Sequence, residues 1–371
     1  MRRLLALALA AAVVGYLAFG AVAWQRRGLR EAQASPALAA AEARGAWHVH
    51  TTASDGRGTL DEVARAARAA GLRFVVVSDH DVLAPAEPRY QDGVLLVPAT
   101  EASTRQGHVV ALGVSRALTR AERDGDALAA IRALGGQAVI AHPLHPRRAF
   151  TGWGGGAWRG LEVISNDTAW YRALADRDLR RVLEALAVLP WDPPRAVLAL
   201  LDDPADELRR LDGELRRARA AAGAGPAPAH VLLCSADAHG YPGYAAAFGA
   251  FSMHVPVTLG GDAARDAAAV RAALLDGRAA CVLDGVAPAA GVRLTPTAEG
   301  ALSLSLHGAA AGSRTYTLLH DGAPAGRFEA ARDGSAGGTF RCGGRCPPGD
   351  YRAEVALDGR RWIFTNPVRI E

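Results

Sequence analysis

Ala46-Trp-His-Val-His-Thr-Thr-Ala-Ser-Asp-Gly56 is the segment on which the interpretation of this chain depends. His48 and His50 are two residues apart, so on a β-strand both imidazoles point to the same face. Asp55 follows a turn rich in Thr and Ser, and Gly56 allows the chain to turn tightly. Two histidines and a carboxylate at a strand end indicate the start of a metal site. A strand that merely carries two histidines would show the same pattern, so the rest of the chain must decide.

The composition indicates a large folded chain without a nucleic-acid-binding face. With 371 residues, 50% of them hydrophobic, the chain is long enough for two domains or for one large domain with an appendage. All 42 basic side chains are arginines, and they are scattered among 38 acidic ones, which leaves a net charge of only +4. This pattern lacks the basic stripe and interleaved aromatic residues of a nucleic-acid-binding protein. We therefore expect a small-molecule substrate.

The N-terminus carries the features of a membrane anchor or a secretion signal. Met1-Arg2-Arg3 precedes an uncharged run over residues 4–24, which at about 1.5 Å per helical residue covers a bilayer core. Ala21-Val22-Ala23 resembles a signal cleavage site, but the run is long for a signal peptide and arginines follow it closely. This favours an uncleaved transmembrane anchor within residues 1–30, followed by an Ala-rich linker over 31–45. We expect the body to lie outside the cytoplasm, anchored on the periplasmic side, or secreted if the segment is cleaved.

The four cysteines fall into two pairs of different character. Cys342 and Cys346 lie in a loop rich in Gly and Pro, where a short disulfide would fit an oxidising compartment. Cys234 and Cys281 lie in apolar runs, and we expect them to be buried thiols.

Short apolar strands alternate with helices over residues 46–287, which predicts an α/β barrel of mainly parallel strands. Phe74-Val-Val-Val-Ser78, for example, is a continuous apolar run typical of a strand buried on both faces. His108 stands at the start of a predicted strand, and we expect it to begin the return strand of a hairpin that leaves Glu101. Residues from about 169 to 222 are mostly helical, which predicts an insertion over one side of the site. Ordinary surface helices of the barrel would show the same pattern.

The pattern changes to alternating β-strands from about residue 288. Leu302-Ser-Leu-Ser-Leu306 alternates apolar and polar residues, and His320-Asp-Gly322 carries a hairpin turn signal. These features predict a small β-sandwich over 288–371. We see no catalytic set in it, and we interpret His307 and His320 as structural.

Nine polar side chains share a position next to a predicted strand terminus. They are His48, His50, Asp55, His80, Glu101, His108, His142, Asp237 and His239. Barrels of this kind place their chemistry at the C-terminal ends of the strands. Six of the 11 histidines belong to this set, and burying so many polar groups would be costly without a compensating ion. The set therefore favours a metal centre.

These residues lie in motifs that resemble those of the polymerase and histidinol phosphatase (PHP) superfamily. The motifs follow the family's order: His-Val-His-Thr-Thr-Ala-Ser-Asp-Gly from residue 48, Ser-Asp-His-Asp from 78, Glu101 with Ser103, Gly-His-Val-Val-Ala-Leu-Gly from 107, Ala-His-Pro from 141 and Ser-Ala-Asp-Ala-His from 235. The appended β domain with its tail Phe364-Thr-Asn-Pro-Val368 resembles the exported or membrane-associated branch. That branch includes the carbaryl-hydrolase-like metallohydrolases, the CehA/McbA type.

The resemblance implies a distorted (β/α)7 PHP-type barrel that holds two or three divalent metal ions. It implies three ligand sets: His48, His50, Glu101 and Asp237 for the first ion, Asp55, His80 and His239 for the second, and Glu101, His108 and His142 for a third. Asp55 stands where some members have His, which predicts a weaker or different metal there. Manganese, zinc and iron all suit such mixed nitrogen and oxygen ligands.

A metal-activated hydroxide predicts a hydrolase, and the leading prediction is a phosphoesterase acting on a small or nucleotide-like phosphoester. The predicted catalytic residues are Asp55 and His239, either of which could shuttle a proton to the leaving group, and the bridging Glu101.

Four further residues are candidates for substrate binding. Arg105, Arg147 and Arg148 follow ligands in loops and could hold a phosphate or carboxylate, although solvated loop arginines would look the same. Asn166 follows a strand and could line the pocket. Two other functions stay open: a carbamate, amide or ester metallohydrolase, which aromatic residues such as Trp170 keep in view, and a non-enzymatic membrane-anchored binding protein.

Overall fold

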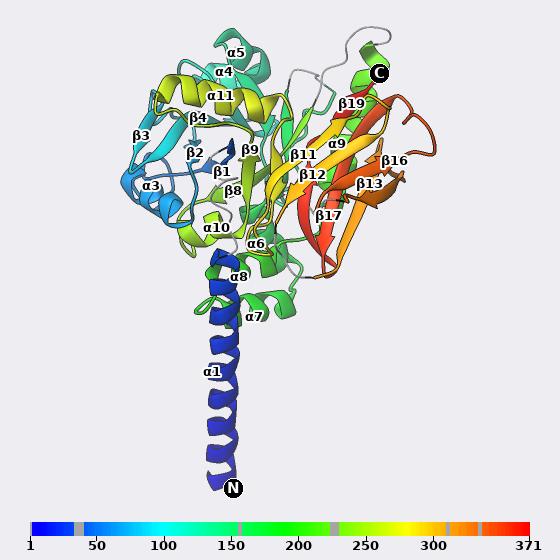
Figure 1. Ribbon diagram of the computed structural model, residues 1–371. Coiled ribbons are helices and arrows are strands. Elements are labelled where there is room, and N and C mark those ends of the chain that lie inside the picture. The colour runs from blue at the N-terminus through cyan, green and yellow to red at the C-terminus, as the bar shows by residue number, and fades with distance from the viewer. Residues whose placement is uncertain (1, 33–40, 155–157, 223–229, 309–311, 333–335) are drawn as a thin grey trace.

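The computed structural model describes residues 2–32, 41–154, 158–222, 230–308, 312–332 and 336–371. A barrel and a β domain lie side by side, and helix α1 (Arg2–Ala32) projects away from both (Figure 1). The chain thus has a mixed α/β body with one long helix outside it.

Seven strands close the barrel within the described residues, because β1 pairs with both β2 and β8. The pairings β4–β5 and β5–β6 are antiparallel, and the other five around the ring are parallel. The barrel strands are β1 (Ala43–Val49), β2 (Phe74–Val77), β4 (Val94–Thr104), β5 (Gly107–Leu112), β6 (Gln137–Ile140), β7 (Gly160–Ser165) and β8 (Val231–Ala238). The short β3 (Arg89–Gln91) pairs with β4 outside the ring. The predicted α/β barrel of seven strands is therefore confirmed in its strand number and closure.

The hairpin predicted around His108 is confirmed. Strands β4 and β5 pair antiparallel, with Ser103 opposite His108 and Glu101 opposite Val110. Glu101 and His108 therefore lie on neighbouring strands at the same end of the barrel.

Helices cover the outside of the barrel, and their ends are set by local hydrogen bonds. Thr59 and Glu62 form a capping box at the start of α3, and α3 buries Val63, Ala64 and Ala67 in the core. The other outer helices are α4 (Arg120–Asp124), α5 (Ala127–Ala133), α10 (Tyr244–Ala250) and α11 (Ala263–Leu275), and α3 itself is Leu60–Ala69.

The helical segment predicted over 169–222 contains four helices, which play two different parts. They are α6 (Asn166–Ala175), α7 (Leu179–Val188), α8 (Pro193–Leu200) and α9 (Ala205–Ala222). Helix α9 packs against β7 and against β17 (Gly349–Leu357), as a barrel helix would. Helices α6, α7 and α8 pack on one another, and α8 also packs on α10 (Figure 1). The interpretation as a surface helix of the barrel therefore fits α9, and the interpretation as an insertion fits α6, α7 and α8.

The β domain consists of two sheets around a shared apolar core. One sheet contains β13 (Arg314–His320), β14 (Ala323–Ala325), β17 (Gly349–Leu357), β18 (Arg360–Thr365) and β19 (Val368–Ile370). The other contains β11 (Ala290–Pro296), β12 (Leu302–His307), β15 (Arg327–Ala330) and β16 (Gly338–Arg341). Val292 and Phe340 from the second sheet pack in one cluster with Tyr351 and Trp362 from the first. This is the arrangement of a β-sandwich.

The β domain and the barrel share hydrogen-bonded strands. Strands β9 (Ser252–Val255) and β10 (Ala280–Val282) continue the sheet from β1, and β10 pairs with β18. Asn366, just after β18, accepts a hydrogen bond from the Leu232 N–H (2.8 Å) and donates to the Leu232 carbonyl (3.1 Å). The C-terminal tail is thereby fixed to β8, the strand that carries Asp237.

The N-terminal region is only partly described. One helix among the described residues is long and apolar enough to cross a membrane, over Ala8–Arg26, and a secretion signal would pass the same test. Residues 33–40 of the predicted linker lie outside the described residues. The end of that predicted linker is wrong, because Ala43–Gly45 already pair with β2 and β9 as part of β1.

Both cysteine pairs form disulfides. The predicted bond between Cys342 and Cys346 is present. The prediction of free thiols at Cys234 and Cys281 is wrong, because these residues form a buried disulfide between β8 and β10, with Cα atoms 5.9 Å apart. The two cysteines are 47 residues apart, so only the folded sheet brings them together.

Candidate metal centre

His48 and His50 converge as predicted, but through a bulge rather than regular strand alternation. The register of β1 shifts between Ala46 and Val49, and His48 has a left-handed backbone with φ of 65°. The two Nε2 atoms lie 3.0 Å apart, and both side chains are fully buried. The β1 strand ends at Val49, so His50 stands at the mouth of the barrel.

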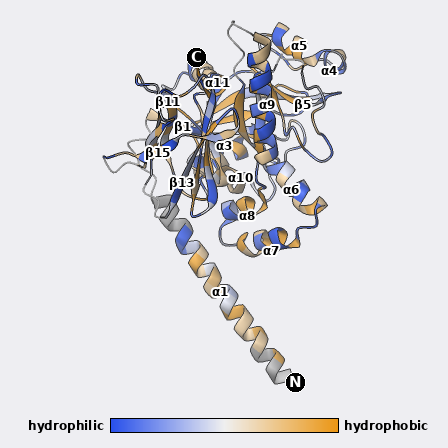
Figure 2. Ribbon diagram, turned by 90° about the vertical axis from the view of Figure 1, so that its right-hand side faces the viewer, coloured by the Kyte–Doolittle hydropathy of each residue, from blue (hydrophilic) through white to orange (hydrophobic). Residues whose placement is uncertain are grey.

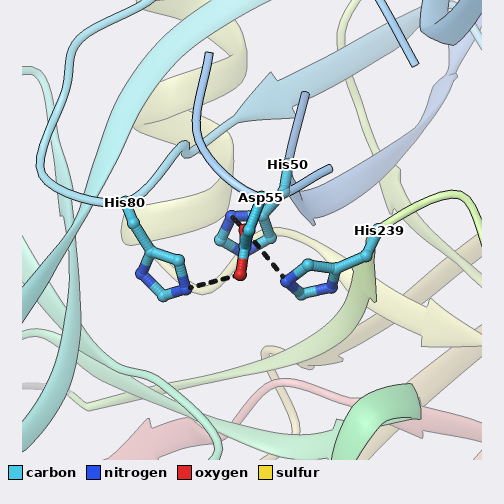
Figure 3. Close-up of side chains that lie close together, drawn as sticks. All are labelled: His50, Asp55, His80 and His239. Atoms are coloured by element: carbon cyan, nitrogen blue, oxygen red, sulfur yellow. Dashed lines mark ion pairs between the residues drawn. The ribbon is translucent and has the colours of Figure 1, made fainter. Parts of the chain in front are cut away.

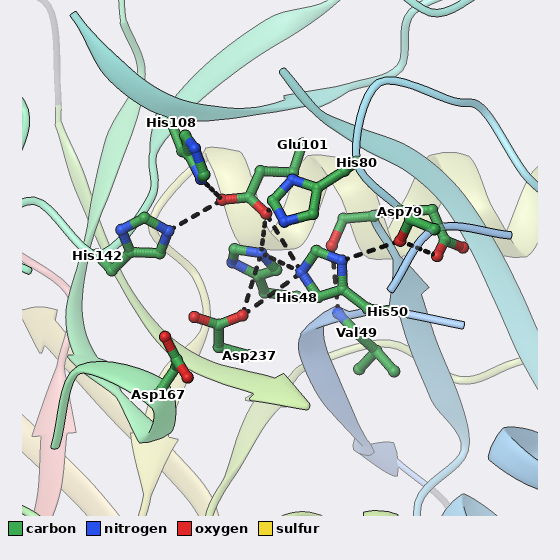
Figure 4. Close-up of polar contacts among 12 residues, drawn as sticks. His48, Val49, His50, Asp79, His80, Glu101, His108, His142, Asp167 and Asp237 are labelled. Atoms are coloured by element: carbon green, nitrogen blue, oxygen red, sulfur yellow. Dashed lines mark hydrogen bonds and ion pairs between the residues drawn. The ribbon is translucent and has the colours of Figure 1, made fainter. Parts of the chain in front are cut away.

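Glu101 is the hub of the site, and its two oxygens face different histidines (Figure 4). Oε2 lies 3.1 Å from His48 Nε2 and 3.2 Å from His50 Nε2, and His80 Nδ1 lies 3.1 Å away. Oε1 accepts hydrogen bonds from His108 Nδ1 (2.8 Å) and His142 Nε2 (3.0 Å). One buried carboxylate therefore connects five of the six predicted histidine ligands.

Asp237 completes the inner set. Its Oδ1 lies 3.6 Å from His48 Nε2 and 3.4 Å from His50 Nε2. The corresponding atoms of His48, His50 and Glu101 are only 3.0 to 3.2 Å from one another. Neighbouring ligands of one cation with bonds of about 2.1 Å would be about 3 to 3.4 Å apart. These three side chains thus fit adjacent positions around one divalent cation, and Asp237 lies beside them.

A second set lies nearer to solvent and is centred on Asp55 (Figure 3). The carboxylate lies 3.3 Å from His239 Nε2 and 3.6 Å from His80 Nε2, and His50 Nδ1 is 3.5 Å away. The side chain of Asp55 is 53% exposed, whereas that of Glu101 is 1% exposed. Asp55 is therefore open to water and substrate, and Glu101 is not.

The metal-ligand atoms fall into three overlapping groups within the described residues, each with its atoms within 4.8 Å of one another. The groups are His50, Asp55, His80 and His239; His48, His50 and Glu101; and His80, Glu101 and His108. These groups contain seven of the nine predicted ligands; the other two lie against them, His142 through Glu101 and Asp237 through His48 and His50. The groups overlap at His50, His80 and Glu101, so the division among individual ions stays a prediction, as do the residue roles.

The electrostatics of the inner set are those of a cation site. Burial by itself would lower the pKa of His48, but Glu162, Glu101 and Asp237 hold it well above its usual value. Burial likewise opposes ionisation of Glu101, yet the charge of His48 and hydrogen bonds from His108 and His142 keep its pKa well below the usual value. Ionised carboxylates in a buried site require positive charge close by, from protonated imidazoles or from a metal ion.

Strained backbone marks the ligand positions. His142 and Asp237, like His48, have positive φ values, of 27° and 39°. Non-glycine residues rarely adopt this conformation, and such strain is concentrated at functional sites. Packing and hydrogen bonds hold these three side chains in place against that preference.

Glu162 is a functional residue that the sequence analysis missed. Its Oε1 accepts hydrogen bonds from His48 Nδ1 (2.7 Å) and Trp47 Nε1 (2.7 Å), and its Oε2 accepts one from the His142 N–H (2.7 Å). Because His48 donates through Nδ1, its Nε2 is free to act as a ligand. The available signal was a single carboxylate inside the apolar strand Leu161-Glu-Val-Ile164.

Asp79 is a second missed residue, and it shapes the ligand loop. It accepts hydrogen bonds from the Thr51 N–H (2.7 Å), the Thr51 hydroxyl (2.7 Å) and the Ser54 hydroxyl (2.6 Å). These bonds hold the turn that brings Asp55 back over His50. Asp79 directly precedes the ligand His80, which was the signal in the sequence.

A cavity of about 620 Å³ opens next to the outer set and contains most of the predicted substrate-binding residues. Arg147, Arg148 and Asn166 line it together with Asp55, Asp237 and His239. Arg57 lines it as well and was missed, although it directly follows Gly56. Arg105 is not among the lining residues; its exposed guanidinium lies 3.7 Å from Asp124. Its predicted role in substrate binding therefore stays a prediction.

The motifs that resemble those of the PHP superfamily carry the side chains that the barrel brings together. The sequence matches no family model and none of the curated proteins. One similar solved structure is a two-domain protein from Bacteroides vulgatus containing a predicted PHP-like metal-dependent phosphoesterase, with 14% identity, a TM-score of 0.38, and coverage of 89% of this chain and 95% of that one.

A second similar structure is an amidohydrolase from Chromobacterium violaceum with bound sulfate and no metal. It has 18% identity and a TM-score of 0.26, and the match covers 36% of this chain and 84% of that one. Similarity at this level carries no argument about activity, which depends on the site itself.

Proposed function

We propose that the chain is a metal-dependent hydrolase, and that its preferred substrates are phosphoesters. The observation that carries the proposal is the inner cluster of His48, His50 and Glu101, whose ligand atoms lie 3.0 to 3.2 Å apart with Asp237 beside them, as expected for the ligands of one cation. Divalent ions, when bound, lower the pKa of a coordinated water towards neutrality and so make hydroxide available for hydrolysis.

The residues of the chain divide the remaining work. Glu162 orients His48, and Asp79 holds the loop that carries Asp55. Asp55 and His239 lie 3.3 Å apart at the border between ligands and cavity, where either could pass a proton to a departing oxygen. The buried inner set would keep bulk water away from the opposite side of the centre.

The preference for phosphoesters is supported by three arginines. Arg57, Arg147 and Arg148 line the same cavity as the outer ligands, and planar guanidinium groups bind phosphate oxygens bidentately. The guanidinium of Arg147 lies 4.8 Å from the centre of the Tyr171 ring, which helps to hold it in place.

A second candidate function is hydrolysis of carbamate, amide or ester bonds. Trp170, Tyr171 and Tyr241 line the cavity, and an aromatic wall suits an acyl or aryl group. The same hydroxide would serve both reactions, so only substrates can separate them.

Elemental analysis combined with a substrate panel tests the proposal. The full chain, loaded separately with manganese, zinc or iron, should bind at least one equivalent and hydrolyse a phosphomonoester or phosphodiester faster than an aryl ester or carbamate. Asp237→Asn should lose both metal and activity while staying folded. Asp284→Asn is the matched control, since Asp284 is also a buried carboxylate paired with a histidine but lies outside the ligand groups.

Two outcomes would contradict the proposal. Wild-type turnover by Asp237→Asn would exclude the assigned centre. A metal-loaded chain without turnover of any of these substrates would favour the alternative of a membrane-anchored binding protein.

The location of the body stays a proposal of its own. We propose that α1 anchors the chain and that the body faces an oxidising compartment such as the periplasm. Two disulfides support this, because such bonds persist outside the reducing cytoplasm.

A further inference from the structure

The cavity beside the metal centre has two chemically different ends. One end holds the outer ligands and the three arginines described above. The other end is apolar and is formed by α6, α7, α8 and the residues that follow α7: Trp170, Leu174, Leu186, Leu189, Val197 and Leu200. A single cavity that joins a charged end to an apolar arm suits an amphiphilic ligand. A small polar phosphoester would leave the apolar arm empty.

Helix α7 exposes an apolar face next to this arm. Leu179, Leu183 and Leu186 follow each other at helical spacing and are 68%, 64% and 53% exposed, while Ala185 and Val188 on the other face are buried. Arginines at 180 and 181 stand beside these leucines, and Figure 2 shows both kinds of residue on α7. Exposed leucines flanked by basic residues are typical of a helix that lies in a membrane interface. Leu186 also lines the cavity, so the cavity opens onto this leucine face.

The candidate membrane helix contacts the same region. The hydroxyl of Tyr16 donates a hydrogen bond to the Ala187 carbonyl at the end of α7 (3.1 Å), and its ring lies 5.8 Å from that of Trp191. Tyr16 lies within the apolar span Ala8–Arg26, ten residues before its end, which is about 15 Å along a helix. If Arg26 stands at the membrane surface, the end of α7 reaches the acyl-chain region of the same leaflet (Figures 1 and 2).

Charged residues of both signs lie at the level at which α1 leaves the apolar span. Arg26 lines one cavity together with five other arginines, among them Arg180 and Arg181, and with four acidic residues, among them Glu184 and Asp202. Arg180 pairs with Glu184, and Arg181 pairs with Asp202. A band of charged groups with arginines in excess suits the headgroup level, while the leucines of α7 lie on the side of the acyl chains.

We propose that the substrate is a lipid phosphoester taken directly from the membrane, with its acyl chain in the apolar arm between α6, α7 and α8 and its phosphate at the arginines and the metal centre. This inference rests on the proposed phosphoesterase function. A bond forms between the oxygen of water and phosphorus as the bond from phosphorus to the lipid oxygen breaks. One proton of the water ends on that lipid oxygen, so the products are phosphate and a lipid alcohol.

The dependence of turnover on chain length tests the occupancy of the apolar arm. The metal-loaded full chain is assayed by phosphate release from phosphatidic acids of increasing acyl length below their aggregation limits, with p-nitrophenyl phosphate as the chain-free reference. KM should fall by up to about fourfold for each methylene that becomes buried, until the arm is filled. Leu186→Glu should flatten this dependence, because it places a charge at the entrance of the arm.

A second pair of variants tests access from the bilayer. Leu179→Glu/Leu183→Glu changes two exposed leucines that do not line the cavity, so turnover of p-nitrophenyl phosphate should stay within about twofold. Turnover of long-chain phosphatidic acid in phosphatidylcholine vesicles should fall by about tenfold or more. Ala264→Glu/Ala268→Glu is the matched control, since it adds the same charges at the same spacing on α11, at the opposite end of the body (Figure 1).

The possible results distinguish a failure of the lipid substrate from a failure of the proposed phosphoesterase activity. Turnover of p-nitrophenyl phosphate with no chain-length dependence and no effect of the α7 variant on vesicles would overturn the lipid substrate and leave the phosphoesterase standing. Equal losses on vesicles with the α7 and α11 variants would overturn the α7 surface as the route from the bilayer. No turnover of any phosphoester by the metal-loaded chain would overturn both.

Discussion

Two clusters of histidine and carboxylate side chains are buried in this molecule, and their hydrogen-bond geometry suits different roles. In the metal centre, His48 and His50 bring two ring nitrogens within 3.0 Å of each other and face the same carboxylates. In the second cluster, His254 gives each ring nitrogen its own partner: Nδ1 lies 2.6 Å from Glu42 and Nε2 lies 3.2 Å from Asp284. In the metal centre the ligand atoms point at one another. In the second cluster each ring nitrogen of His254 has a hydrogen-bond partner of its own.

The location of the second cluster explains its purpose. Glu42 precedes β1 and also accepts a hydrogen bond from the Gly291 N–H of β11 (2.9 Å), while Asp284 follows β10 and pairs with Arg44 (3.1 Å). The cluster therefore joins the start of the barrel to the β domain. The comparison teaches that a buried histidine indicates a ligand only when its nitrogens converge with others instead of being paired one by one.

The largest expected effect is a loss of bound metal when a histidine of the metal centre, but not of the second cluster, is changed. His50→Gln removes a nitrogen shared by the inner and outer sets, and should lower bound metal and phosphoester turnover by more than about 100-fold, because changes even to the partners of ligands cost 10–100-fold. His254→Gln should leave metal content per folded chain unchanged. Elemental analysis and phosphate release check both variants, and metal loss with His254→Gln would remove the distinction.

Stability should respond in the reverse order. His254→Gln removes the cation between Glu42 and Asp284, which then keep only the guanidinium groups of Arg293 and Arg44. Removal of one partner from a buried pair costs about 3–5 kcal/mol when the other charge is left alone. We expect a decrease of up to that size in the free energy of unfolding, measured in urea on the metal-free chain. In the same assay His50→Gln should lower the free energy of unfolding by less, because it also removes the repulsion between His48 and His50. A smaller loss for His254→Gln than for His50→Gln would contradict the structural role of the second cluster.

Glu162 and Glu42 sharpen the comparison, because each carboxylate accepts a hydrogen bond from a histidine Nδ1. Glu162→Gln should weaken metal affinity or turnover by about 10–100-fold, since it no longer holds His48 in the ligand tautomer with a full charge. Glu42→Gln should leave both unchanged. Metal titration of the two variants measures this, and equal affinities would show that Glu162 does not orient the ligand.

The smallest expected effect is a change of stability with pH. Burial opposes the charge of His254, yet Asp284 and Glu42 raise its pKa, so its contribution is complete below about pH 6.5 and is lost as the pH rises through the folded value. Burial similarly opposes the charge of Glu42 and Asp284, but their pKa values are lowered by His254. Their contribution is complete above about pH 4.5 and is lost as the pH falls.

The difference in unfolding free energy between wild type and His254→Gln isolates this effect, because all other titrating groups are common to both proteins. It should be largest between about pH 5 and 6.5 and should decrease towards pH 9. Urea unfolding at several pH values provides the measurement. A difference that stays constant over this range would show that His254 is not charged in the folded protein.

Much of the metal centre could be predicted because its signals are local. Each ligand stands next to an apolar run that ends in a strand terminus, so His80 and His142 could be selected without knowing what lies opposite them. Glu162 was missed because it lies inside a strand, where its neighbours in sequence are apolar. Its partners Trp47 and His48 lie 115 and 114 residues away along the chain.

The same limit explains the other differences. Glu42 was assigned to the linker because nothing near it in sequence indicates burial; its partner His254 is 212 residues away. Cys234 and Cys281 were expected to be thiols for the same reason, since β8 and β10 meet only in the folded sheet. Arg105 was selected because it follows a ligand in a loop, and its side chain is exposed beside Asp124.

The amino-acid sequence alone determined the class of architecture, the order of the ligand motifs and the nine side chains that meet at the barrel mouth. These depend on strand periodicity and on the residues next to each strand end, which are properties of short segments. The folded chain alone decided which carboxylate accompanies which histidine, which cysteines are joined, and that apolar residues of α6, α7 and α8 line the same cavity as the outer ligands. Those features depend on contacts between residues far apart in the chain, and periodicity contains no information about them.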